Sequence, residues 1–263
     1  MHKLPWIVTP LVVLLLATGC SGDDDADPTS TPGAPASPTA AATAPAPAPT
    51  VPSDLLAGVS DEPVAFQAED GVVIRGHLYA QPGPARKAVI FAHMFPADQI
   101  SWKQTAQELT AAGVATLTFD FRGYGESDGD KEIDKIYLDL ESAVLFLESR
   151  DFSEIYLVGA SMGGTASLKV AATEAIAGVV AVSAPVEFRG LSAEDEVAQV
   201  TAPKLFIASS GDGAAADALH YFVGAAPDPK ESQVFDGSAH GTDLLQSEHA
   251  DALKQLIIDF IAG

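Results

Sequence analysis

Short apolar runs without polar alternation place the strongest constraint on how this chain folds. Three of them cover residues 88–91, 155–158 and 205–207. A strand that is apolar at every position is buried on both faces, which is typical of parallel sheets covered by helices. Segments with helical spacing, such as Leu253, Leu256, Ile257 and Phe260, alternate with these runs. The pattern predicts a mostly parallel sheet between two layers of helices.

The alternation begins near residue 54 and predicts a single domain over 54–263 with eight strands. The first two strands alternate between apolar and polar residues, so we expect them to form an antiparallel edge. The predicted strands are 64–69, 72–79, 87–93, 114–120, 154–160, 178–183, 203–209 and 231–236. The predicted helices are 98–112, 131–149, 162–174, 214–225 and 242–261.

The first 19 residues have the pattern of a signal peptide. Lys3 precedes an apolar stretch over 4–17, and the small residues Thr18 and Gly19 follow it. This stretch is shorter than the roughly 20 apolar residues that a membrane-spanning helix needs. A retained transmembrane anchor is the alternative interpretation.

Cys20 is the only cysteine of the chain and directly follows the small residues of the leader. The segment 17–20 resembles the bacterial lipoprotein box, which implies that the Cys20 thiol is acylated and that the mature chain begins at this residue. Ordinary secretion with cleavage nearby is the alternative. We therefore expect an extracytoplasmic protein, palmitate-bearing and lipid-anchored to a bacterial membrane.

Residues 20–53 are predicted to form a disordered tether after the acylated cysteine. Asp, Pro, Ala, Thr, Ser and Gly make up nearly all of residues 21–53, a composition that cannot build an apolar core. Alternating proline over 44–49 favours an extended spacer.

The charge of the chain disfavours polyanionic partners. Its 14 Lys and Arg stand against 36 Asp and Glu, a formal net charge of −22. A chain with this charge is repelled by phosphate backbones, so we expect no nucleic-acid partner. Composition leaves the oligomeric state open.

The segment 159–164, Gly-Ala-Ser-Met-Gly-Gly, follows a predicted buried strand and precedes a predicted helix. It matches the nucleophile elbow, in which a serine stands at a sharp turn between strand and helix. Small residues are needed two positions before and after Ser161 to avoid backbone clashes, and Gly159 and Gly163 meet this need. Ser161 is therefore a candidate nucleophile.

A serine nucleophile needs a histidine base that a carboxylate orients. Asp212 follows the seventh predicted strand, and His240 lies in a glycine-flanked loop after the last one, which gives the order serine, acid, histidine. Asp212 could instead be a helix N-cap, with Asp236 as the competing acid. The other candidates for the base are His77, His93, His220 and His249.

Two further motifs, over 93–96 and 120–127, extend the resemblance to the α/β-hydrolase superfamily across most of 60–263. The motif His-Met-Phe-Pro over 93–96 resembles the turn that donates a backbone N–H to the oxyanion, which implies this role for Phe95 and, after the nucleophile, for Met162. The motif over 120–127 resembles a turn that is structural in most members. The resemblance implies a three-layer α/β-hydrolase sandwich and catalytic roles for Ser161, Asp212 and His240.

Residues 186–200 are too few for a substantial cap domain, so we expect an open site, similar to the dienelactone-hydrolase-like and small esterase branches. The expected reaction is cleavage of a carboxylic ester or related acyl substrate without metal or cofactor. A peptidase, a thioesterase and a non-catalytic binding lipoprotein of the same fold are the alternatives.

Overall fold

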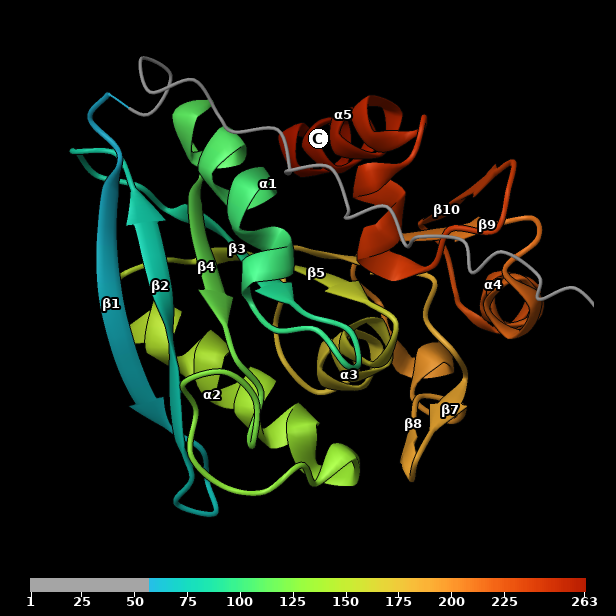
Figure 1. Ribbon diagram of the computed structural model, residues 1–263, viewed down its shortest axis with the longest axis horizontal. Helices are drawn as coiled ribbons and strands as arrows, with labels where there is room; N and C mark the ends of the chain where they lie inside the picture. The colour runs from blue at the N-terminus through green and yellow to red at the C-terminus, as the bar shows by residue number, and fades with distance from the viewer. Residues whose placement is uncertain (1–56) are drawn as a thin grey trace, which may run out of the picture. The chain divides into compact units, whose positions relative to one another are not determined.

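The computed structural model describes residues 57–263. The predicted signal peptide, Cys20 and the predicted tether lie outside these residues. The described part forms an eight-stranded sheet in the order β1-β2-β4-β3-β5-β6-β9-β10 (Figure 1). Its strands are β1 (Ser60–Gln67), β2 (Val73–Ala80), β3 (Lys87–Ala92), β4 (Ala115–Phe119), β5 (Glu154–Ala160), β6 (Gly178–Val182), β9 (Lys204–Ser209) and β10 (Lys230–Phe235).

The sheet is parallel from β4 to β10, whereas β2 runs antiparallel to both β1 and β4. The eight predicted strands and the antiparallel edge are therefore confirmed. Parallel strands end at the same edge of a sheet, so the loops after β3, β5, β6, β9 and β10 all leave from one side. This edge holds the candidate site.

Helices cover both faces of the sheet, as predicted. They are α1 (Ile100–Ala111), α2 (Ile136–Ser149), α3 (Met162–Ala171), α4 (Gly213–Ala225) and α5 (Ala250–Ala262). Residues of α2, α3 and α4 pack into one apolar cluster, and residues of α1 and α5 pack into the other. Consecutive residues of β3 belong to different clusters: Ile90 lies in the first and Val89 in the second. The predicted three-layer sandwich is confirmed.

The prediction of one continuous helix over 242–261 is wrong. The chain forms a 3₁₀ helix, η3 (Gly241–Gln246), and then breaks before α5. Ser247 has an extended backbone, and its hydroxyl accepts the amide of His249. A side chain that bonds the local backbone in this way competes with helix continuation. The helix predicted over 131–149 similarly begins as a separate 3₁₀ turn, η1 (Ile133–Lys135).

Residues 186–200 form two small elements that were not predicted. One is a hairpin of β7 (Glu187–Phe188) and β8 (Leu191–Ser192), and the other is the 3₁₀ turn η2 (Val197–Gln199). Strands of two residues are too short to produce a recognisable periodicity. The described residues contain no cap domain beyond this hairpin, in agreement with the prediction.

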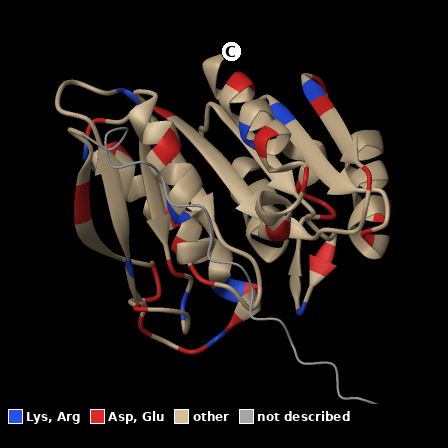
Figure 2. Ribbon diagram, turned by 45° about the horizontal axis from the view of Figure 1, so that its top comes forward, with Lys and Arg blue, Asp and Glu red and all other residues tan. Residues whose placement is uncertain are grey.

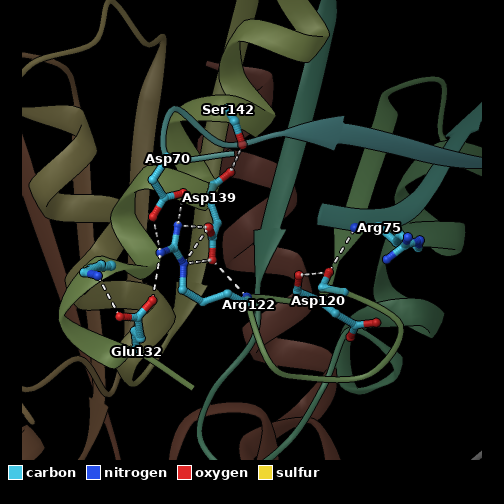
Figure 3. A network of polar contacts seen from close by, with 9 residues as sticks. Asp70, Arg75, Asp120, Arg122, Glu132, Asp139 and Ser142 are labelled. Atoms are coloured by element: carbon cyan, nitrogen blue, oxygen red, sulfur yellow. Dashed lines mark hydrogen bonds and ion pairs between the residues drawn. The ribbon is translucent and has the colours of Figure 1, made fainter. Parts of the chain in front are cut away.

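The turn 120–127 is held by a buried ion-pair network (Figure 3). The guanidinium of Arg122 is fully buried between Asp139 of α2, 2.7 Å away, and Asp70 of the β1–β2 turn, 2.6 Å away. Loss of one partner from such a pair costs about 3–5 kcal/mol, because an unpaired charge stays buried. The network supports the structural interpretation of this turn.

None of the helices in the described range has the length and apolar character of a membrane span.

Candidate active site

Ser161 stands at a strained turn between β5 and α3. Its φ is 49° and its ψ is −120°, values that L-residues rarely adopt. A Cβ at Gly159 would lie 2.2 Å from the carbonyl oxygen of Gly163, and a Cβ at Gly163 would lie 2.4 Å from that of Ala92. Glycine is therefore required on both sides of Ser161, as the elbow motif predicts.

The structure brings Ser161, His240 and Asp212 together in one line of hydrogen bonds. His240 Nε2 lies 2.8 Å from Ser161 Oγ, and His240 Nδ1 lies 2.9 Å from each carboxylate oxygen of Asp212. The His240 side chain is 38% exposed and that of Asp212 is 13% exposed. The imidazole is therefore accessible from outside while the carboxylate behind it is shielded. This arrangement can remove a proton from the serine hydroxyl.

Asp212 immediately precedes α4 but does not cap it. Its side chain makes no hydrogen bond to the amides of that helix, and the carboxylate faces His240 instead. Asp236, the competing acid, is exposed, and its backbone carbonyl oxygen is 3.0 Å from His249 Nε2. The geometry therefore favours Asp212 over Asp236.

Two hydrogen bonds at the ends of β9 and β10 hold the loops that carry the acid and the histidine. Ser209 Oγ donates to the carbonyl of Ala239 at 2.7 Å, and the Gly211 amide donates to the carbonyl of Gly237 at 2.7 Å. No local pattern in the sequence marks Ser209 for this role, because its partner is 30 residues away.

The remaining candidate histidines have other surroundings. His93 is fully buried, donates from Nδ1 to the Met94 carbonyl and accepts the Phe121 amide at Nε2. Burial lowers the pKa of His93, so it is the neutral imidazole that supports this turn. His77 pairs with Asp61 at the edge of the sheet, and His220 is exposed on α4.

The turn that carries Phe95 lies against the start of α3. An added Cβ at Gly163 would contact the carbonyl oxygens of both Ala92 and His93, so these backbones are in close approach. Within the described residues, the Phe95 and Met162 amides donate to no other protein group. Two free amides beside a nucleophile can stabilise an oxyanion. Met94 packs its thioether against Gly241, in the loop of His240.

An open groove of about 410 Å³ lies beside the loop of Asp212. It is lined by the segment after β6 and by the first turns of α4, with Glu187, Asp217 and Tyr221 among its residues. Thr165 Oγ1 of α3 donates to the Pro185 carbonyl, which links the groove wall to the helix of the nucleophile.

The described residues contain no group of three or more His, Cys, Asp and Glu side chains that could hold a metal ion.

The chain is similar in sequence to several hydrolases over part of its length. Residues 83–191 match the serine aminopeptidase S33 family, a stretch that contains Ser161 but ends before Asp212 and His240. A bifunctional epoxide hydrolase of Sus scrofa is 34% identical over 79 residues, 29% of this chain and 14% of the relative. A thiohydrolase of Arthrinium phaeospermum is 33% identical over 118 residues, 42% of this chain and 38% of the relative. The matched segments thus span less than half the length of these relatives.

Solved structures extend the similarity to most of the described residues. An esterase of Pyrococcus furiosus superposes with a TM-score of 0.69 at 20% identity, covering 82% of this chain and 98% of the esterase. A dienelactone hydrolase from Anabaena variabilis gives a TM-score of 0.67 at 21% identity, covering 78% and 98% of the two chains. Strand order, the turn at Ser161 and these comparisons together establish that the chain has the α/β-hydrolase fold.

Proposed function

We propose that this protein is a serine hydrolase that cleaves carboxylic esters through an acyl-enzyme intermediate. The observation that carries the proposal is the hydrogen-bonded line from Ser161 Oγ through His240 to Asp212, with distances of 2.8 and 2.9 Å. Ser161 also has a positive φ of 49° at a helix start, a strained conformation of the kind that clusters at active sites.

Each residue has a defined part in the proposed reaction. His240 Nε2 takes the hydroxyl proton as Ser161 Oγ attacks the ester carbonyl carbon, and Asp212 stabilises the imidazolium through Nδ1. The amides of Phe95 and Met162 donate to the carbonyl oxygen, which becomes negative in the tetrahedral intermediate. The imidazolium then protonates the departing alcohol. Water, activated by the same histidine, releases the acid and restores Ser161.

The choice of esters rests on the comparisons as well as on the site. The structural relatives include an esterase, and the superposition with this chain covers 98% of the esterase. The thiohydrolase relative makes thioesters the second substrate class to examine, and the family of the matched segment makes peptides the third. All three proceed through the same acyl-serine.

A fluorophosphonate probe tests the nucleophile directly. Wild-type protein should be labelled, Ser161→Ala should not, and Ser149→Ala, at an exposed helix end, should be labelled as the wild type is. A panel of 4-nitrophenyl esters of increasing acyl length, with matched thioesters and anilides, then ranks the substrate classes. An unlabelled wild type that hydrolyses nothing would favour a binding protein of the same fold.

We propose further that Cys20 is the lipidated first residue of the mature protein and that the enzyme acts at the outer face of a bacterial membrane. The support is the lone cysteine after a short apolar leader and before a spacer rich in Pro and Ala. Cys20→Ser should move the protein to the soluble fraction or leave its leader uncut, with hydrolysis unchanged. A Cys20→Ser protein that stays on the membrane with its leader removed contradicts lipidation.

A further inference from the structure

The β7–β8 hairpin places an unusual residue at its tip. Its two turn residues, Arg189 and Gly190, have φ values of 51° and 89°. Two-residue turns with both φ values positive prefer Asn or Gly at the first position, because a larger side chain costs roughly 1–2 kcal/mol there. Arg189 adopts this conformation in spite of that cost, and residues in such strained conformations cluster at functional sites.

The Arg189 guanidinium lies on the aromatic side chains beside the candidate oxyanion site. Its central carbon is 4.3 Å from the centre of the Phe95 ring and 5.1 Å from that of Phe188. The two rings contact each other, with centres 5.8 Å apart. Arg189 thus contacts the residue whose amide is the proposed oxyanion donor.

Arg189 makes no ion pair with any of the described residues. Two carboxylates belong to its immediate neighbourhood: Glu187 accepts the Gly190 amide, and the Cβ of Asp134 lies near Gly190. Neither pairs with the guanidinium. The chain has a formal net charge of −22, and Figure 2 shows Asp and Glu residues along many of its elements, so the guanidinium of Arg189 is left unpaired in spite of the acidic residues around it.

Tyr124 adds a hydrogen-bonding group to the same region. Its ring is buried against His93, with ring centres 5.0 Å apart, and its hydroxyl has no partner among the described residues. Burial raises the pKa of Tyr124, and the positive charge of Arg189 acts in the opposite direction. Lys131, which also lacks an ion pair in the described part of the chain, lies over the Tyr124 ring at 4.2 Å.

We propose that Arg189, with the Tyr124 hydroxyl, binds a carboxylate carried by the substrate, so that the preferred esters are monoesters of dicarboxylic acids. The guanidinium offers two parallel N–H donors that match a carboxylate, and stacking on Phe95 and Phe188 fixes its plane. A buried unpartnered hydroxyl is costly unless a ligand uses it. This proposal rests on the proposed esterase function, since it names the substrate class of the same site.

The test compares two esters that differ only in charge: the 4-nitrophenyl monoester of glutaric acid and its methyl ester. In Arg189→Gln the ratio of kcat/KM for the anionic ester over the neutral one should fall about fivefold, the range of an exposed ion pair. Arg86→Gln is the matched control, because Arg86 is exposed and lacks an ion pair among the described residues. It also directly precedes β3, so it lies where the parallel strands begin, whereas the candidate site lies where they end. Equal ratios in the two variants overturn the proposal.

Tyr124→Phe separates binding from folding. If the hydroxyl serves the substrate, this variant lowers the same ratio while its Tm stays at or above that of the wild type, since no internal hydrogen bond is lost. An unchanged ratio contradicts the role of the hydroxyl.

A binding measurement tests the carboxylate site independently of ester hydrolysis. In the full-length Ser161→Ala protein, calorimetric titration should show tighter binding of monomethyl glutarate than of dimethyl glutarate, and adding Arg189→Gln should abolish the difference. If neither nitrophenyl ester is cleaved by the wild type but this difference is present, the esterase proposal fails and the carboxylate site stands. If the esters are cleaved and the difference is absent, only the carboxylate site fails.

Discussion

The hydroxyl of Ser209, the last residue of β9, donates a 2.7 Å hydrogen bond to the carbonyl of Ala239, the residue before His240. Ser209 is fully buried. The strand that leads to Asp212 thus holds the loop of the histidine directly. The alignment of acid and base depends on this contact as well as on their own hydrogen bonds.

Ser209→Ala should therefore lower kcat by about tenfold, which corresponds to about 1.4 kcal/mol of lost alignment. The free energy of unfolding should fall by about 1–3 kcal/mol, because the Ala239 carbonyl loses its partner. Steady-state kinetics and urea unfolding measure the two effects. Ser149→Ala, which removes a similar bond at an exposed helix end, should change neither. A fall in stability with kcat intact would show that the loop keeps its position without Ser209.

Asp212→Asn should lower kcat by about 10⁴-fold while the fold is retained, because an amide stabilises the wrong tautomer of the His240 imidazole. Circular dichroism and the kinetics of a 4-nitrophenyl ester check both points. Asp236→Asn is the matched control, since Asp236 is exposed and its carboxylate does not bond to His240. The reverse order of effects would mean that the acid is misassigned.

Gly163→Ala should reduce kcat by about 10²-fold, because its methyl group would lie 2.4 Å from the Ala92 carbonyl oxygen and force α3 away from the turn of Phe95. Gly224→Ala in α4 is the control: nothing lies within 4 Å of the new methyl group, and alanine should stabilise that helix by roughly 0.5–1 kcal/mol. Ester kinetics and thermal unfolding distinguish the two variants. A fully active Gly163→Ala would contradict the close approach at this elbow.

His93 should make stability depend on pH below neutrality. Burial lowers its pKa in the folded state, so between the ordinary value of about 6.5 and that lower value the unfolded chain binds more protons. Its contribution is therefore complete above pH ~6.5 and is lost as the pH falls, with a slope of at most about 1.4 kcal/mol per pH unit. Urea unfolding at pH 7.5 and 5.5 should show a smaller difference for His93→Gln, which keeps a donor and an acceptor but does not titrate. His220→Gln, at an exposed position, should behave as the wild type.

The sequence predicts those parts of this fold that depend on burial and on short-range backbone geometry. Strands such as β5 and β9 are apolar because both faces are covered, and the requirement for glycine at 159 and 163 follows from one sharp turn. For Asp212 the same local pattern fits a helix cap and a triad acid, and only the long-range contact with His240 separates them. The hairpin tip at Arg189 and the bond between Ser209 and Ala239 have no local signal, because each depends on residues distant in sequence.

The position of β10 has a consequence for how the activity is lost. His240 follows β10, an edge strand that among the described residues pairs only with β9 and whose own residues are mostly exposed or half-buried. Ser161 follows β5, in the interior of the same sheet. Edge strands with few buried contacts open locally at a lower free energy than the core. Local unfolding of β10 can therefore break the hydrogen bond between His240 and Ser161. Mild denaturant should then inactivate the protein reversibly while its central strands and helices remain folded.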